Sequence, residues 1–197
     1  MAEQIKDGSG RGYLVKVTSD NKLVTTAETV TEEQHANDIG DAYNINTGII
    51  TLTDDVETPL LYIKNNEAQD MIILAVALGM FDSTGGTTSN MYSTFIRNPL
   101  SGTIISSTPT DVPIKSNRNY GSANTLTADC YVGATGDTMT DGDDHILVRL
   151  GPGSRSYIGI NEVLTKGASF GVKLKPQTSN TSMGCYAAVI CYLRTDI

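Results

Sequence analysis

The densest group of possible ligands in this sequence is one Gly-containing stretch in which aspartates precede a histidine: Asp137, Asp141, Asp143, Asp144 and His145. Hard cations such as Ca²⁺ favour several carboxylate oxygens that converge on one point. The spacing departs from an EF-hand loop, because this stretch lacks the alternating ligand rhythm and the distal Glu. The four aspartates are therefore weak metal candidates. We expect a solvated acidic loop, with no metal and no cofactor bound.

Other catalytic chemistry has little support. His35 and His145 accompany no recognisable Ser or Cys nucleophile, and the Cys and His spacing provides no zinc ligand set. The glycine strings at residues 8–12 and 151–153 lack the preceding strand and following helix that a phosphate-binding loop requires. Carboxylate pairs for glycoside hydrolysis usually come with aromatic sugar platforms, and Trp is absent. The prediction is that the protein is not an enzyme.

The charge argues against nucleic acid as a partner. The chain has 14 Lys plus Arg against 22 Asp plus Glu, a formal net charge of −8, whereas phosphate binding relies on clustered cations. Residues 1–58 hold 11 acidic and only 4 basic groups, so the acidity belongs to the N-terminal region. That region is either a solvated arm or one that docks on a positive neighbour. The longest apolar run, residues 71–81, is too short for a membrane-spanning helix, and we expect no membrane role.

The three cysteines, Cys130, Cys185 and Cys191, form an odd number with no CxxC spacing. Cys185 and Cys191 lie six residues apart on the same side of one extended run, which is too far for a disulfide between them. We therefore expect all three to be small buried hydrophobic residues.

The elements that must position these residues are mostly strands. Short runs that alternate apolar and polar residues, or are apolar throughout, are separated by turn residues: residues 44–52, 60–64, 71–81, 92–97, 103–106, 111–115, 125–132, 146–150, 157–160, 170–174 and 185–193. Only residues 28–38 lean towards a helix, and they form either a linker or one marginal helix. This pattern predicts an all-β, jelly-roll-like β-sandwich over residues 41–197. Residues 1–40 form an extended N-terminal arm with a short β-hairpin and a linker.

The last of these runs is apolar on both of its faces. Cys185, Ala187 and Val189 lie on one face, and Tyr186 and Ala188 begin the other. Such a strand needs two coverings. One is the facing sheet, and we infer that the other is a further protein chain. Tyr and Arg are enriched at protein contacts, although these tyrosines could instead fill a core poor in Phe. The candidate interface residues are Tyr13, Val15, Glu32, Glu33, Asp38, Tyr186, Tyr192 and Arg194.

Three stretches carry a resemblance to a known family. They are GDAYNINTGIITLT at residues 40–53, FIRNP followed by SNRNYGSANTLTADCYVG within residues 95–133, and LTKGASFGVKLKPQTSNTSMGCYAAVICYL at residues 164–193. In these stretches the chain resembles virion structural proteins of tailed bacteriophages, of the type that decorates or cements the capsid. The resemblance implies a non-enzymatic jelly roll, a homotrimer, and the major capsid protein as partner.

The expected function is therefore that of a decoration protein. It binds the outer surface of a phage capsid and stabilises it, after synthesis in the cytoplasm of the bacterial host. Acidic residues 28–41 would meet a basic patch on the shell. Two alternatives stay open: a head-fibre or tail component that contacts the host surface, and a carbohydrate-binding jelly-roll module with Ca²⁺ in residues 137–145.

Overall fold

The computed structural model describes residues 30–52, 56–82, 90–106, 113–151, 153–177 and 183–194. The expected N-terminal hairpin, with Tyr13 and Val15, lies outside these residues. All of the elements below belong to one compact unit, Glu32–Ile197.

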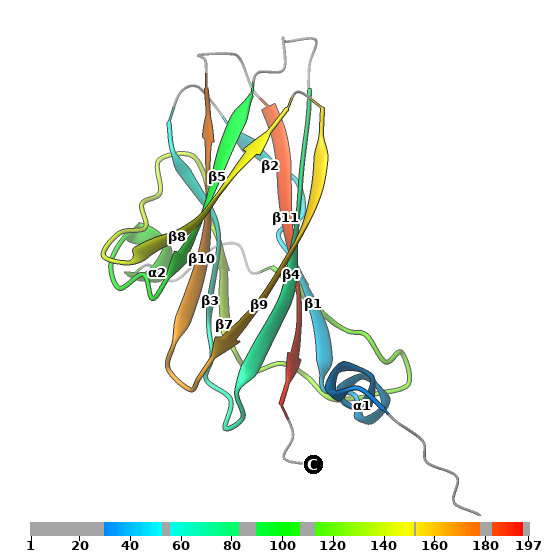
Figure 1. The fold of residues 1–197 in the computed structure, drawn as a ribbon. Coiled ribbons are helices and arrows are strands. Elements are labelled where there is room, and N and C mark those ends of the chain that lie inside the picture. Colours follow the sequence, from blue (N-terminus) through cyan, green and yellow to red (C-terminus); the bar gives the residue numbers. More distant parts are fainter. Residues whose placement is uncertain are drawn as a thin grey trace, which may run out of the picture. The chain divides into compact units, whose positions relative to one another are not determined.

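Two antiparallel sheets make up this unit (Figure 1). The six-stranded sheet contains, in spatial order, β6 (Ile114–Asn117), β1 (Ala42–Asn46), β11 (Met183–Leu193), β4 (Met71–Asp82) and β9 (Arg155–Leu164), with β2 (Ile50–Leu52) also paired to β11. The five-stranded sheet contains β7 (Asp129–Val132), β3 (Thr58–Lys64), β10 (Ser169–Pro176), β5 (Met91–Arg97) and β8 (Asp143–Leu150). Two helices accompany them, α1 (Glu32–Ile39) and α2 (Thr103–Ser106).

The strand order is that of a jelly roll. When the short strands β2, β6 and β7 are set aside, one sheet reads β1-β11-β4-β9 and the other β3-β10-β5-β8. Successive strands thus pass between the sheets in the double Greek-key pattern that defines this fold. The prediction of an all-β, jelly-roll-like sandwich is confirmed.

The core lies between the two sheets, because alternate residues of each strand face inward. Val76 of β4 and Val189 of β11 are fully buried there, and Phe95 and Phe170 meet edge to face with ring centroids 5.8 Å apart. The strand expected at residues 71–81 is confirmed as β4, which pairs with β11 and β9.

Three expected strands differ from the structure. The short piece expected at residues 103–106 forms helix α2 instead. The run at residues 44–52 is broken into β1 and β2, because Gly48 adopts a left-handed φ of 71° and its N–H donates to Asn46 Oδ1 at 2.9 Å. The run at residues 125–132 becomes a strand only at Asp129.

The expected linker or marginal helix at residues 28–38 forms helix α1, which packs on the outer face of the six-stranded sheet beside β1 (Figure 1). Its buried residue Ala36 contacts a cluster of Ala42, Ile72 and Tyr192. The inference that only another chain covers the second face of residues 185–193 is therefore wrong at the Tyr192 end. A helix of the same chain covers it.

Candidate functional site

A polar loop, residues 117–124, binds the C-terminal end of α1. Asn117 Nδ2 donates to the carbonyl of Gly40 at 2.6 Å, Asn119 Nδ2 to that of Asp38 at 3.0 Å, and Asn124 Nδ2 to that of Ile39 at 3.3 Å. The last carbonyls of a helix have no partner within the helix. Three asparagine amides thus satisfy successive carbonyls at this end. We call α1 together with residues 117–124 the α1–loop surface.

The loop is ordered by its own hydrogen bonds. Asn117 Oδ1 accepts from the N–H of Asn119 at 2.8 Å, and Asn119 Oδ1 accepts from the N–H of Gly121 at 3.0 Å. Such side chain to backbone bonds two residues on are Asx turns, which fix the backbone locally. Tyr120 lies between Asn119 and Gly121, and its side chain is fully exposed. An exposed Tyr on an ordered loop is a favourable anchor for a partner protein, because little freedom is lost when it binds.

The first turn of α1 is held by ion pairs and hydrogen bonds. Glu33 pairs with Arg118 at 2.6 Å. Glu32 Oε2 accepts from the Tyr192 hydroxyl at 3.1 Å and lies 3.6 Å from Arg194 Nε. Burial, followed by the Glu32 carboxylate, raises the pKa of the Tyr192 phenol, which therefore remains a donor.

The structure brings five candidate interface residues together at α1: Glu32, Glu33 and Asp38 lie on the helix, and Tyr192 and Arg194 lie beside it at the end of β11. Tyr192 is buried beneath the helix, so its ring is not free for a partner. Asp38 is exposed, whereas the Glu32 and Glu33 carboxylates are engaged within the chain. Tyr186 lies elsewhere, at the opposite end of β11, where its ring covers Gly79.

The middle of the same outer face is not covered by α1. Ala77 and Ala188 are directly paired and half-buried, and Tyr157 follows Ala77 across the sheet. In the other direction the row passes through the exposed Asn46 to Ile114. Large apolar side chains are thus exposed on both edge strands: Ile114 on β6, and Tyr157 and Val163 on β9. We call Ala77, Ala188, Ile114, Tyr157 and Val163 the apolar band.

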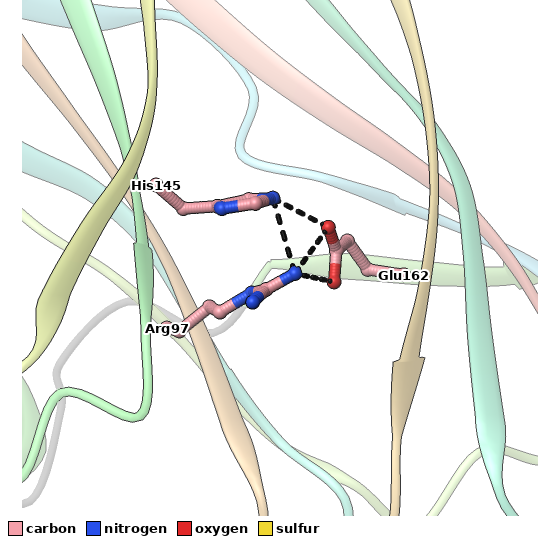
Figure 2. Close-up of polar contacts among 3 residues, drawn as sticks. All are labelled: Arg97, His145 and Glu162. Carbon is pink, nitrogen blue, oxygen red and sulfur yellow. Dashed lines mark hydrogen bonds and ion pairs between the residues drawn. The ribbon is translucent and has the colours of Figure 1, made fainter.

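A charged cluster joins the two sheets at another edge (Figure 2). Arg97 on β5 places Nη2 2.8 Å and 2.7 Å from the two oxygens of Glu162 on β9. His145 Nε2, on β8, lies 2.6 Å from Glu162 Oε1. Burial alone would raise the pKa of Glu162, but the hydrogen bonds from Arg97 and His145 outweigh it and hold that pKa below its ordinary value of 4.5.

This cluster was missed by reasoning from the sequence, which considered His145 only as a neighbour of the acidic loop and as a possible partner of a nucleophile. Its three members are far apart in the chain and share no motif. One signal was present: Glu162 lies on the inward-facing side of β9, the same side as Ile158, Ile160 and Leu164. A carboxylate in such a position requires a partner.

The four aspartates proposed as weak metal ligands do not converge. Asp137 accepts hydrogen bonds from Thr103 Oγ1 at 2.9 Å and from the N–H of Ala134 at 2.8 Å, which is a structural role. The other three, Asp141, Asp143 and Asp144, line an open pocket of about 470 Å³ beside the Lys173–Glu57 ion pair. Among the described residues, no three His, Cys, Asp or Glu side chains form a group that could hold a metal ion.

All three cysteines are free and buried, as predicted. Burial raises the pKa of Cys130 and of Cys185 to about 12, and it raises that of Cys191 as well. Thiols in such surroundings are poor nucleophiles at neutral pH. Within the described part of the chain, no helix is long and apolar enough to cross a membrane.

Comparisons with known proteins add little to this geometry. No family model matches the chain, and no curated protein matches it. A solved structure of the T13 viral particle of IBDV contains a chain that is weakly similar, with a TM-score of 0.26 and 9% sequence identity. The similarity covers 99% of this chain and 41% of that one, so this chain spans less than half the length of the similar chain.

Proposed function

We propose that this protein is a non-enzymatic virion structural protein that binds the outer surface of a phage capsid and stabilises it. The observation that carries the proposal is the α1–loop surface. There, a fully exposed Tyr120 is held on an ordered loop beside an acidic helix. The jelly-roll topology and the sequence resemblance to capsid decoration proteins support the same reading.

Attachment would use two linked contacts. Residues 1–31 precede α1 directly and hold four acidic and four basic residues, so the acidic charge at this place comes from Glu32, Glu33 and Asp38 of α1. A basic patch on the major capsid protein complements this charge. Binding at one contact raises the effective concentration of the other, so modest individual contacts give tight retention.

Self-association would use the apolar band. Ile114 and Tyr157 are each about two-thirds exposed, at 66% and 67%, on a face that α1 covers only at one end. Exposed apolar patches of this kind favour protein contacts. We propose a homotrimer, formed through this band and seated on the shell.

The test is co-sedimentation with capsids purified from the phage that encodes the chain and stripped of this protein. The full chain should sediment with the capsids, and analytical ultracentrifugation should give a species of three chains. A variant that lacks residues 1–31 should keep the native circular dichroism spectrum and lose most of its capsid binding.

The deletion ends at residue 31 because α1 covers Ile72 and Tyr192, and its loss would expose the sheet. A full chain that stays monomeric and does not sediment with capsids would refute the proposed function. Unchanged binding of the shortened chain would refute only the role of residues 1–31.

A further inference from the structure

Two aromatic rings lie across glycines at the end of the six-stranded sheet that is remote from α1. Tyr186 of β11 pairs with Gly79 of β4, and its ring covers that glycine. Two residues along, Phe81 of β4 pairs with Gly184 of β11, and its ring covers this second glycine. Each strand thus places an aromatic ring over a glycine of the other strand. Because glycine has no Cβ, both rings can lie against the backbone. Each is half-buried, with the sheet beneath it.

These rings line a pocket of about 440 Å³ on the outer face of the sheet. Ile49, which is 72% exposed, stands on one side. Arg155 of β9 stands on the other, in register with Gly79. The volume is within the usual range for small-ligand pockets.

Arg155 gives the pocket a single positive charge. Its side chain is exposed, and no carboxylate of the described residues pairs with it. Guanidinium groups bind planar carboxylates through two parallel hydrogen bonds. The complementary ligand therefore carries a carboxylate at one side of a body that can lie on aromatic rings.

A pyranose with a carboxylate substituent has this shape. The C–H bonds on one side of a sugar ring pack on the face of an aromatic ring, because the face of the aromatic ring is apolar and electron-rich. A purely apolar ligand would leave the Arg155 guanidinium unpaired, and a polyphosphate would need more than one cation to balance its charge. The Asn46 amide, whose oxygen accepts from Gly48, lines the pocket and offers its N–H groups to sugar hydroxyls.

We propose that this pocket binds the carboxylate-bearing pyranose of an acidic glycan, with Phe81 and Tyr186 under the sugar ring and Arg155 on the carboxylate. The proposal does not depend on the proposed capsid binding. Tyr186 lies six residues along β11 from Tyr192, which is roughly 20 Å for an extended strand. The pocket and the α1–loop surface are thus at opposite ends of one face, and both can be occupied together.

The test is titration of the full chain with two matched pairs of saccharides, followed by calorimetry and by NMR shifts of labelled protein. One pair is sialyllactose and lactose, and the other is tetragalacturonate and maltotetraose. We expect at least one acidic member to bind tenfold or more tightly than its neutral match. Shifts should be centred on Tyr186, Phe81 and Arg155.

Three variants separate the contributions. Arg155→Met should abolish the preference for the acidic saccharide, and Phe81→Leu should weaken both members of the pair. Tyr92→Phe changes a ring on β5, in the other sheet and outside the pocket, and should bind like the parent protein. Arg155 is at the surface, so its variant remains a test even where Phe81→Leu lowers the melting temperature.

Absence of binding by both acidic saccharides overturns the proposal, as does equal binding within both pairs. Undiminished binding by Arg155→Met overturns it as well. Self-association that Arg155→Met abolishes would assign the pocket to a second copy of the chain, which is also contrary to the proposal.

Discussion

Arg97 and Glu162 join the two sheets of the sandwich through one guanidinium nitrogen, Nη2, that contacts both carboxylate oxygens, at 2.8 Å and 2.7 Å. Arg97 lies on β5 of the five-stranded sheet and Glu162 on β9 of the six-stranded sheet. Because β8 and β9 are edge strands, this contact and the one from His145 close the sandwich on the side where the two edges meet.

The lowered pKa of Glu162 predicts a dependence of stability on pH. A carboxyl whose pKa is lower in the folded than in the unfolded state stabilises the fold fully above its unfolded value, here about 4.5, and loses this contribution as pH falls through the folded value. Glu162→Gln should lower the free energy of unfolding at pH 7 by about 1 kcal/mol. Below pH 4.5 the free energy of unfolding of this variant should also fall less steeply than that of the parent protein, as measured by urea denaturation at several pH values.

The matched control for this prediction is Glu57→Gln, which removes the ion pair with Lys173 at 2.7 Å without affecting the contact between the sheets. Its loss of stability at pH 7 should be smaller, because the Glu57 side chain is 44% exposed whereas that of Glu162 is 18% exposed. Identical pH profiles for Glu162→Gln and the parent protein would contradict the assignment.

The contact between Tyr186 and Gly79 predicts a strict requirement for glycine. A Cβ at position 79 would overlap the Tyr186 ring, so Gly79→Ala must displace that ring. We expect a loss of about 1 to 3 kcal/mol in the free energy of unfolding, as for other overpacked sites. Gly159→Ala on the neighbouring strand is the control, because its Cβ would approach no atom closer than 4.0 Å. Equal stability of the two variants in urea denaturation would show that the ring moves without cost.

The asparagine contacts at the end of α1 predict that Asn119→Ala destabilises the structure around α1 only. Asn119→Ala removes the hydrogen bond to the Asp38 carbonyl and the turn around Asn119 Oδ1. Each lost bond should cost about 1 kcal/mol. Hydrogen exchange should therefore become faster in residues 32–41 and stay unchanged in β4. Asn66→Ala, at an exposed asparagine between β3 and β4, should leave exchange in residues 32–41 as it is. Faster exchange across the whole sandwich would instead indicate global destabilisation.

The exposure of Tyr120 predicts a defect in capsid binding without a defect in folding. Tyr120→Ala should weaken co-sedimentation with capsids by tenfold or more, as expected of an interface anchor. Its melting temperature should match that of the parent, since the side chain is fully exposed. The control is Leu100→Ala, another exposed apolar residue, which lies just before α2 and away from the α1–loop surface. Equal binding by both variants would remove Tyr120 from the interface.

The burial of the three thiols predicts their chemical behaviour. At pH 8 the native protein should react with a thiol reagent such as DTNB only slowly, because the pKa values of Cys130 and Cys185 are raised to about 12. All three thiols should react at once in denaturant. Rapid labelling of the native protein would mean that the sandwich opens readily near β7 or β11.

Much of the fold could be predicted from the sequence, because strand periodicity reports which residues face a core. The alternation at residues 170–174 places Phe170, Val172 and Leu174 inside, as the structure confirms. Periodicity shows that Ile72 and Tyr192 belong to an apolar face, but it does not show what covers that face. The covering helix α1 is polar except at Ala36 and at the exposed Ile39, so its apolar face is only weakly visible in its sequence.

The contacts of the candidate site could not be predicted from the sequence, because they depend on strand register and on which sheet each strand joins. The exchange of rings and glycines between Tyr186 and Phe81 follows from the register of β11 on β4. The charged cluster depends on β8 and β9 lying in different sheets although they are neighbours in the chain. The asparagines of residues 117–124 are recognisable as turn formers, but their helix partner is about 80 residues away: 81 for Asn119 and Asp38, and 85 for Asn124 and Ile39.

The position of β11 has a consequence for synthesis of the chain. This strand occupies residues 183–193, late in the order of the strands, yet it lies between β1 and β4 and pairs with both. Until it has left the ribosome, β1 and β4 have no neighbour on that side, and their apolar residues remain open to other chains. Pairing between such distant segments is slow. The cell that makes the protein therefore has to protect each growing chain until β11 has emerged, and chains truncated before β11 should accumulate as aggregates.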